Sequence, residues 1–494
     1  MISQFGEVWV CPWVNGPTPE ELFRILAGQP HVAWLDSAAN PHGLGRYSYM
    51  AKDPWKVISG RVGRFSVGGT NSFSDDPWQL WENQQSPHSK PDLNSSLPPF
   101  QGGWIFSLGY ELGRTTEQLP KALHDEFETP DFWAGAYDTI VAWDHEEGQC
   151  FVISSGKSAE TESDRPARAS ALILDMMSVR PDGTAGFPRR SLVEVGPFDG
   201  VSVRLPRYPD LVVYSPIGRS TFEENVARVV EFIHAGDCFQ VNLAQRLLSR
   251  LEVAPEELYL TLRRVNPAPF AGYLDLGDTV VASASPERFL RLGQEGWVET
   301  RPIKGTRRRG TTPAEDDALA RELLVSVKDR AENVMIVDLM RNDLGRVCRP
   351  GSISVDEVCR LESYRTVHHL VSVIRGRLRE DKKPGDLLRA TFPGGSVTGA
   401  PKIRAMEIIT ELETVARGPY CGSLGWLGDN QQMDTNILIR TFTAKGGWVQ
   451  FPVGGGIVAD SIPAQEYEET LHKAEGLLRA ILPRIGGLGV NPNP

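Results

Sequence analysis

The 494-residue sequence predicts a protein of the α+β class, and two patterns support this prediction. In residues 1–155, short apolar segments alternate with clusters of Gly, Pro and Asp, which is typical of antiparallel strands joined by irregular loops. From residue 215 onward, long stretches of helical periodicity are mixed with hairpin-like strands. Strands and helices do not alternate with the regular spacing of a parallel sheet, so an α+β architecture is favoured.

The composition divides the chain into three regions. Residues 1–155 form a strand-rich N-terminal region, and residues 215–485 hold the strongest helical signals and most of the chemistry-bearing motifs. Residues 156–214 are rich in charged, Ser and Pro residues, so they are expected to form a connector with one short helix around 169–177.

Four helices are predicted in the C-terminal region. The first occupies about residues 221–235, where apolar residues recur at helical spacing. The second covers about residues 313–345, with or without a break, and has Thr312 as N-cap and a proline at its first position. The third and fourth start at Pro401 and Pro463, because proline is tolerated in the first turn of a helix.

Charge and cysteine content exclude several classes of protein. With 52 Lys and Arg against 63 Asp and Glu, the net charge of −11 argues against a nucleic-acid partner, and the run Arg307–Arg309 is the only dense basic segment. The six cysteines show neither a Cys-x-x-Cys pair nor zinc-ligand spacing, which indicates thiols in a reducing compartment. No apolar run approaches the roughly 18 residues of a membrane span, and the first residues lack the basic segment of a secretory signal. We therefore expect a soluble, cytoplasmic protein with no membrane contact.

Lys304 is the first residue with a chemical interpretation. It lies in the segment Arg301-Pro302-Ile303-Lys304-Gly305-Thr306. A lone lysine is usually solvated, but a lysine in an apolar cleft has its ammonium form disfavoured and can become a nucleophile or a base. The surrounding motifs have to decide between these two readings.

Two acidic pairs fall on predicted helices. Asp329 and Glu332 share one helix face, and so do Glu466 and Glu469 on the last helix. Each pair by itself is better explained as a solvated face, with Glu469 and Lys473 as an i,i+4 ion pair. If the two pairs come together, a hard cation such as Mg²⁺ would be needed between them.

Glycine-rich segments and one arginine complete the candidates. Residues 392–401, Phe-Pro-Gly-Gly-Ser-Val-Thr-Gly-Ala-Pro, lead into a helix but are not a Walker P-loop, because no Lys-Ser/Thr pair follows the last glycine. Residues Gly454–Gly456 follow a predicted strand and permit close approach to a ligand. Arg440 lies in the strand-like run 436–443 and would need a carboxylate partner.

The order of these motifs resembles that of the chorismate-utilising enzymes. The motifs that carry the resemblance are Ser285-Pro286-Glu287-Arg288-Phe289, Pro302–Thr306, Asp329–Asn333, Asp338–Asp343, His368–Ser372, Gly394–Lys402, Gly454–Ser461 and Glu466–Lys473. The resemblance is dense from about residue 215 to 483 and thinner upstream, where it depends on Leu35–Ala38 and Arg46–Ser48. It implies an anthranilate synthase component I-like fold, in which antiparallel sheets pack as a sandwich flanked by helices.

Two positions separate the reactions within this family. Isochorismate and salicylate synthases carry a water-activating lysine where this sequence has Gln240. Anthranilate synthases have alanine at the position of Lys304, whereas aminodeoxychorismate synthases have lysine within the same Pro-Ile-Lys-Gly-Thr motif. The resemblance thus implies formation of 4-amino-4-deoxychorismate from chorismate and ammonia, on the route to 4-aminobenzoate and folate.

The resemblance also assigns roles to individual residues. Lys304 would attack C2 of chorismate to form a covalent intermediate, and Glu287 would be the general acid for the departing 4-hydroxyl group. The residues expected to bind substrate are Gln240, Thr306, His369, Ser396, Tyr420, Arg440, Gly454, Gly455, Gly456 and Lys473. The residues expected to bind Mg²⁺, directly or through water, are Asp329, Glu332, Glu466 and Glu469. Asp329 stands where many relatives have glutamate, and its shorter side chain favours a bridging water.

A second ligand site and a partner are implied as well. Relatives hold tryptophan at the positions matched here by Ser37, Leu44, Gly45, Arg46, Tyr47, Pro269, Phe270 and Ala271, although ordinary aromatic packing explains these residues equally well. None of the six cysteines lies in a glutaminase context, so a separate glutamine amidotransferase subunit would supply the ammonia in a heterodimer. Two alternatives remain open: an anthranilate synthase large subunit, and a non-catalytic sensor of chorismate or tryptophan.

Overall fold

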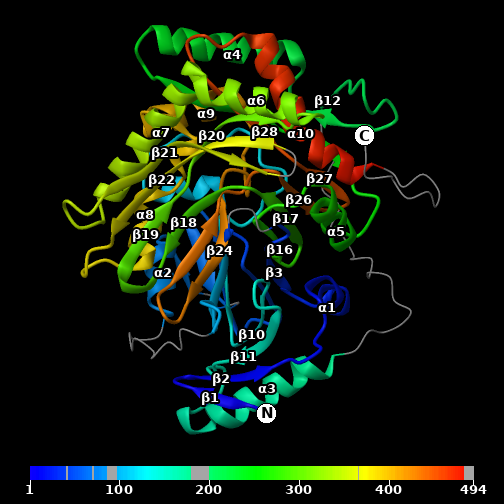
Figure 1. The fold of residues 1–494 in the computed structure, drawn as a ribbon, viewed down its shortest axis with the longest axis vertical. Helices are drawn as coiled ribbons and strands as arrows, with labels where there is room; N and C mark the ends of the chain where they lie inside the picture. Colours follow the sequence, from blue (N-terminus) through cyan, green and yellow to red (C-terminus); the bar gives the residue numbers. More distant parts are fainter. Residues whose placement is uncertain are drawn as a thin grey trace.

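The computed structural model describes residues 1–39, 43–68, 70, 72–85, 97–179, 200–364 and 367–482. Two large antiparallel sheets form its centre, and helices lie on their outer faces (Figure 1). The α+β prediction and the flanked sandwich are therefore confirmed.

The first sheet has 13 strands among the described residues. In spatial order they are β1 (Ser3–Phe5), β2 (Val8–Pro12), β11 (Gln149–Ser154), β10 (Thr139–Asp144), β4 (Tyr47–Ala51), β3 (Ala33–Asp36), β16 (Phe270–Asp275), β17 (Thr279–Ser285), β26 (Thr441–Lys445), β27 (Trp448–Gln450), β15 (Leu248–Arg250), β13 (Tyr214–Ser215) and β12 (Val201–Ser202).

The second sheet has 12 strands in the described part of the chain. Their order is β20 (Ile303–Arg308), β22 (Val367–Arg377), β19 (Trp297–Thr300), β18 (Arg288–Leu292), β25 (Met433–Asn436), β24 (Ser423–Gly428), β8 (Gly103–Leu108), β9 (Phe132–Tyr137), β5 (Lys56–Arg61), β6 (Arg64–Val67) and β7 (Phe73–Ser74), with β21 (Ser354–Ser363) also paired to β22. A small third sheet consists of β23 (Gly399–Ala400), β14 (Gln240–Gln245) and β28 (Val453–Ile457).

The helices cover both outer faces of the sandwich. The α-helices are α1 (Pro19–Leu26), α2 (Pro77–Glu82), α3 (Arg165–Ser178), α4 (Arg219–His234), α5 (Pro255–Val265), α6 (Pro313–Val325), α7 (Val327–Gly345), α8 (Pro384–Thr391), α9 (Lys402–Glu413) and α10 (Pro463–Ile481). Short 3-10 helices are η2 (Tyr110–Thr115), η3 (Glu162–Asp164), η4 (Gln294–Gly296) and η5 (Gly395–Val397). In Figure 1, α4, α6, α9 and α10 gather at one end of the molecule, and α3 lies with the N-terminus at the other.

The hydrophobic core consists of layers that match this architecture. One cluster lies between the two large sheets and includes Tyr49, Ile105 and Trp426. A second cluster joins the second and third sheets to α4, α7, α8 and α9, and a third joins the first sheet to α1, α3, α5 and α10. Each helix therefore buries one apolar face against a sheet, which is what fixes its position.

The regions predicted from composition share their sheets. Strand β3, from the N-terminal region, pairs with β16 of the C-terminal region, and β8 likewise pairs with β24. The division at 155 and 215 thus remains a prediction about the sequence, while both large sheets take strands from both sides of it. Residues 180–199 of the predicted connector and residues 483–485 lie outside the described residues.

Most predicted helix boundaries are close to the observed ones. Thr312 caps α6 by accepting a hydrogen bond from the backbone of Glu315, and the pattern that continued to residue 345 is broken at Ser326, which caps α7. Helix α4 begins at Arg219, earlier than expected, because Gly218 rather than a hydroxyl residue occupies the N-cap position. Helices α9 and α10 start at the predicted prolines or one residue beyond.

The predicted strand 436–443 is wrong in its middle. Strand β25 ends at Asn436 in the second sheet, and β26 begins at Thr441 in the first sheet. The four residues between them carry the chain across the sandwich, and Arg440 has a positive φ of 53° there. An apolar run can be a buried crossing as well as a strand, and periodicity alone does not separate the two.

Other global expectations can be compared with the described residues. No helix in this part of the chain is long and apolar enough to cross a membrane. All six cysteines are present as free thiols. The basic run is neutralised locally, because Arg307 pairs with Glu322, Arg308 with Glu315, and Arg309 with Asp316.

Candidate functional site

Lys304 lies on β20, at a bulge in the ladder that this strand forms with β22. Its Nζ donates a hydrogen bond to the backbone oxygen of Ser396, at 2.9 Å. Burial lowers the pKa of the Lys304 ammonium, and the nearby carboxylates Glu332 and Glu287 oppose that change. The amine is therefore closer to its nucleophilic neutral form than a solvated lysine would be.

Gly305 makes the bulge possible. Its φ is +81°, and a β-carbon added there would lie 3.0 Å from Asp329 Cβ and 3.0 Å from Leu323 Cδ1. We expect Gly305→Ala to lower the free energy of unfolding by roughly 1–3 kcal/mol, as for other side chains forced into a rare backbone conformation. It should also lower turnover, because Lys304 is the preceding residue.

The measurement is urea denaturation followed by circular dichroism, with Gly385→Ala as the matched control. Gly385 lies in the first turn of α8, and nothing lies within 4 Å of where its β-carbon would be. That variant should be neutral or slightly stabilised. Equal stability of the two variants would contradict the role assigned to Gly305.

Glu287 faces the same backbone turn as Lys304. Its side chain is 4% exposed, and burial raises its pKa to about 7, against the lowering effects of a hydrogen bond with Ser396 and of the Lys304 charge. A large fraction of Glu287 is thus protonated at neutral pH, which a general acid requires. Ser396, on η5, contacts both Lys304 of β20 and Glu287, which lies in the link between β17 and β18.

The acidic residues of α7 line the site from one side. Asp329 pairs with Arg307 at 3.1 Å. Burial raises the pKa of Glu332, and the charges of Lys304 and Lys328 act in the opposite direction. The two carboxylates do lie on the same helix, as predicted, but Asp329 is engaged by an arginine of β20.

The acidic residues of α10 approach from the opposite side, across Gly455. An ideal β-carbon at Gly455 would lie 3.4 Å from Glu466 Oε2, 3.5 Å from Glu469 Oε1 and 3.3 Å from Lys473 Nζ. Lys473 pairs with Glu469 at 2.6 Å and donates to the backbone oxygen of Gly454 at 2.9 Å. Glycine at position 455 therefore leaves the space into which these three side chains point.

The predicted carboxylates also influence one another electrostatically. The charge of Glu469 raises the pKa of both Glu332 and Glu466, although burial is the main cause in each case. Among the described residues, no three Asp, Glu, His or Cys side chains converge tightly enough to hold a metal ion by themselves.

Gln240 of β14 and Gly456 of β28 lie against each other in the small third sheet. Gln240 is 1% exposed, and a β-carbon at Gly456 would lie 2.0 Å from its Nε2. Neither its amide nitrogen nor its amide oxygen has a hydrogen-bond partner within the described part of the chain. A buried amide without partners is costly, by about 1–3 kcal/mol, unless a ligand or water completes its hydrogen bonds.

His369 and Arg440 close the remaining side. His369 Nδ1 lies 2.9 Å from Thr306 Oγ1, and burial together with the charge of Arg440 lowers the pKa of His369 to about 4, so its imidazole is neutral. Arg440 donates to the backbone oxygen of Lys473, and no described carboxylate forms an ion pair with it. The carboxylate partner expected for Arg440 is thus not a protein side chain of this part of the chain. Tyr420 is buried within electrostatic range of Arg440.

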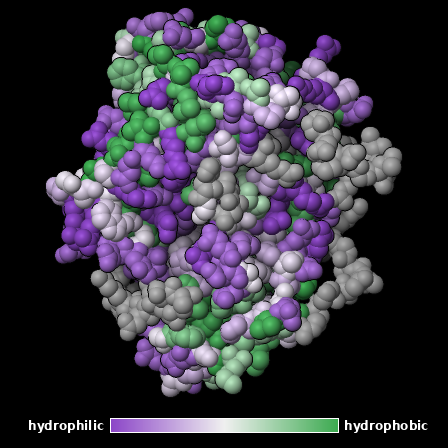
Figure 2. All heavy atoms as spheres, in the orientation of Figure 1, coloured by the Kyte–Doolittle hydropathy of each residue, from purple (hydrophilic) through white to green (hydrophobic). Residues whose placement is uncertain are grey.

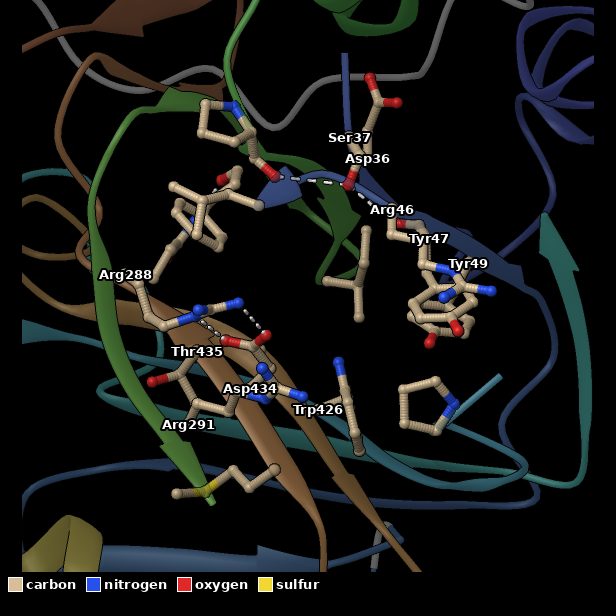
Figure 3. Close-up of a pocket in the computed structure, with 18 of the residues that line it drawn as sticks. Asp36, Ser37, Arg46, Tyr47, Tyr49, Arg288, Arg291, Trp426, Asp434 and Thr435 are labelled. Carbon is tan, nitrogen blue, oxygen red and sulfur yellow. Dashed lines mark hydrogen bonds and ion pairs between the residues drawn. The ribbon is translucent and has the colours of Figure 1, made fainter. Parts of the chain in front are cut away.

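A separate pocket of about 400 Å³ lies between the two large sheets (Figure 3). Of the residues predicted for tryptophan, those that line it are Ser37, Leu44, Arg46, Tyr47, Pro269, Phe270 and Ala271, whereas Gly45 does not. Ser37 Oγ donates to the backbone oxygen of Tyr47 at 2.6 Å and also contacts that of Pro269 at 3.4 Å, which joins the two predicted segments.

Sequence patterns missed several residues of this pocket. Arg288 pairs there with Asp434 at 2.9 Å, and Arg291 and Trp426 contribute to the wall (Figure 3). They come from β18, β24 and β25, far from the N-terminal segments in sequence. Their position in the pocket depends on how these strands pair in the second sheet, which a short sequence segment does not show.

Comparisons with known proteins show the family to which the chain belongs. A family model described as chorismate binding enzyme matches residues 45–479. Aminodeoxychorismate synthase component 1 of Bacillus subtilis (strain 168) is 37% identical over 471 residues, 94% of this chain and 94% of that protein. Anthranilate synthase component 1 of Thermus thermophilus is 38% identical over 473 residues, 95% of this chain and 96% of that protein. The crystal structure of anthranilate synthase component I from Streptococcus pneumoniae TIGR4 matches with a TM-score of 0.73 and 33% identity, covering 87% of this chain and 91% of that chain.

The fold and these matches define the class of protein: the chain belongs to the chorismate binding enzyme family. More particularly, it is a chorismate-utilising enzyme of the anthranilate synthase and aminodeoxychorismate synthase component I type. Relatives with either name occur at similar identity, so identity does not decide between the two reactions.

Proposed function

We propose that this chain is an aminodeoxychorismate synthase component I, which converts chorismate and ammonia to 4-amino-4-deoxychorismate. The observation that supports this reaction most directly is Lys304, whose amine faces the protonatable Glu287 across Ser396. An anthranilate synthase, which has alanine at this position, makes no use of a nucleophile there.

The chemistry takes two displacements. Lys304 Nζ forms a bond to C2 of chorismate while the ring double bond shifts and the C4–O bond breaks, and Glu287 gives its proton to the departing oxygen to release water. Ammonia then attacks C4, the double bond shifts back, and the C2–N bond to Lys304 breaks. The new ammonium group at C4 then loses one proton, which restores the protonated carboxyl of Glu287, so atoms and charge balance.

Chorismate carries two carboxylates, and the site offers cationic and amide groups for them. Arg440, with Tyr420 and the backbone of Gly454–Gly456, would hold the enolpyruvyl carboxylate, and Lys473 would contact a carboxylate as well. Thr306, His369 and Ser396 would line the ring end. The unpartnered amide of Gln240 offers a hydrogen-bond donor and acceptor to the substrate from the small third sheet.

The carboxylates of α7 and α10 fit a magnesium ion held largely through water. Mg²⁺ in proteins usually keeps several waters and takes one or two carboxylates together with substrate oxygens. The charge of Glu469 raises the pKa of Glu332 and of Glu466, as expected where carboxylates lie near one another, and Asp329 would act through water. The ion would neutralise the ring carboxylate of chorismate.

Ammonia would come from a separate glutamine amidotransferase subunit. None of the six cysteines has the sequence context of a glutaminase nucleophile, and five are buried. Exposed apolar side chains on neighbouring helices, Leu324, Val325, Val327, Val334 and Ile403, support a docking surface near the site. Figure 2 shows an apolar area on the upper part of this face, over the region of α6, α7 and α9.

The test is incubation of the purified chain with chorismate, ammonium and Mg²⁺, followed by mass spectrometry and fluorescence. Aminodeoxychorismate is the expected product. Fluorescent anthranilate would overturn the proposal in favour of the anthranilate synthase alternative, and no consumption of chorismate would favour a sensor. If the purified chain uses glutamine efficiently without a second protein, the proposal of a separate amidotransferase subunit is wrong.

We also propose that the 400 Å³ pocket binds tryptophan. Tryptophan at 100 times its dissociation constant should stabilise the fold by about 2.7 kcal/mol, which appears as a rise in Tm in a thermal scan. Ser37→Phe adds a ring to the pocket wall and should abolish this rise, while the activity with ammonium remains. If tryptophan leaves the Tm of the wild-type chain unchanged, the proposal that this pocket binds tryptophan is wrong.

A further inference from the structure

A buried ion pair lies directly behind the proposed substrate site. Arg417 is 3% exposed and follows the C-terminal end of α9, where Glu413 is the last residue. Arg417 Nε donates to Glu413 Oε2 at 2.8 Å, and Arg417 Nη2 donates to Glu413 Oε1 at 2.5 Å. None of the motifs discussed above includes this pair.

The remaining donors of the guanidinium reach two walls of the site. Arg417 Nη1 donates to the backbone oxygen of Val397 at 3.0 Å, and Nη2 donates to that of Asn242 at 2.6 Å. Glu413 Oε1 accepts a hydrogen bond from the backbone of Ala244 at 2.8 Å. One planar group therefore connects η5, which carries Ser396, with β14, which lies beside the three glycines of β28.

Arg417 is itself held in place from several directions. Its guanidinium lies 4.5 Å from the ring centroid of Tyr110 and 5.7 Å from that of Tyr420. The two carboxyl oxygens of Glu111 accept hydrogen bonds from the backbone of Arg417 and of Gly418, at 2.8 and 2.9 Å. These contacts hold the guanidinium of Arg417 in one orientation.

The turn that Arg417 holds is the one that aligns the reacting groups. Val397 follows Ser396, whose backbone oxygen accepts from Lys304 and whose side chain bonds Glu287. We propose that Arg417 is a positioning residue, which keeps η5 where Ser396 aligns Lys304 with Glu287. This inference deepens the proposed function and rests on it.

An arginine is required for this role. The planar guanidinium makes four hydrogen bonds in fixed directions, whereas a lysine ammonium is a point charge that cannot reach Glu413, Val397 and Asn242 together. A shift of about 1 Å in a reacting group can lower turnover by about 10²-fold. Loss of the Arg417 contacts would shift η5, and with it the alignment of Lys304 and Glu287, so the expected effect is on kcat.

The experiment compares Arg417→Lys with Arg165→Lys, using chorismate and ammonium as substrates. Arg165 also donates to backbone, at Ser155 O, but it lies at the start of α3, in the N-terminal part of the fold. We expect Arg417→Lys to lower kcat about 100-fold with the KM for chorismate changed less than about threefold, and Arg165→Lys to leave both unchanged. Guanidinium ion should restore part of the kcat of Arg417→Ala.

Glu413→Gln provides a second variant in case Arg417→Lys does not fold. It keeps an acceptor for Arg417 and should give a smaller fall, about 10-fold, again in kcat. Unchanged kcat in folded Arg417→Lys or Glu413→Gln would overturn the inference, and so would equal changes in kcat and KM.

A readout without turnover separates this inference from the proposed function. Labelling by an amine-reactive reagent, followed by peptide mass spectrometry, reports how Lys304 is held. The labelling rate of the Lys304 amine in Arg417→Lys should differ from that in the wild-type chain, whereas in Arg165→Lys it should equal the wild-type rate. If the wild-type chain makes no product, the proposed function fails. An unaltered labelling rate in folded Arg417→Lys makes the inference fail independently.

Discussion

Lys304→Ala is expected to lower aminodeoxychorismate formation by about 10⁴-fold or more, since removal of a covalent nucleophile has effects of this size. Chorismate binding should change little, because Arg440, Lys473 and the glycines of β28 remain. Rapid-quench kinetics and calorimetric titration with chorismate measure the two quantities separately. In the wild-type chain, a mass increase on the peptide that contains Lys304 should be trapped during turnover.

A matched control for this variant is Lys157→Ala. Lys157 is also partly buried and also has an acidic partner, Asp429 at 2.9 Å, but it follows β11, away from the site. Its removal should leave turnover within about twofold, as for other substitutions outside the site. If Lys304→Ala retains wild-type turnover, Lys304 has a structural role and the covalent mechanism is wrong.

Glu287→Gln should lower kcat by about 10³-fold, within the range for loss of a general acid. Burial raises the pKa of Glu287 to about 7, so the carboxyl is protonated below that pH and loses its proton above it. Wild-type kcat should therefore fall as pH rises through about 7. The variant has no proton to lose, so this descending limb should vanish from its pH profile.

The same ionisation should affect stability. The folded-state pKa lies above the unfolded value of 4.5, so the folded chain binds the proton more tightly, and the free energy of unfolding decreases as pH rises from about 4.5 through 7. Glu287→Gln should weaken this decrease when urea midpoints at pH 5 and pH 8 are compared. A pH profile of activity with an identical descending limb in the variant would show that another group is the acid.

Local sequence signals predicted the local structure well. Thr312 and the proline after it fixed the start of α6, because capping depends on residues within one turn. Local sequence features mark Lys304 and the α10 carboxylates, the family resemblance adds Glu287, and the structure brings these residues to one site. Their roles in catalysis stay predictions.

Long-range features could not be predicted in the same way. The apolar run 436–443 predicts a strand at Arg440, but its backbone crosses between the sheets with a positive φ. Arg417 has no local sequence signal, because its importance comes from contacts with Val397 and Asn242, 20 and 175 residues away. Such contacts depend on the packing of β14, η5 and α9, which no short sequence window contains.

The sharing of strands between the two halves has a consequence for biosynthesis of the chain. Strands β3 and β8 are made early, but their partners β16 and β24 follow more than 200 residues later. Until then their edges carry unpaired backbone groups, and such edges favour association with other chains. Folding with so many distant pairings is slow. A fragment that starts at residue 215 would leave β16 and β24 with the same open edges, so we expect it to aggregate rather than to retain the site.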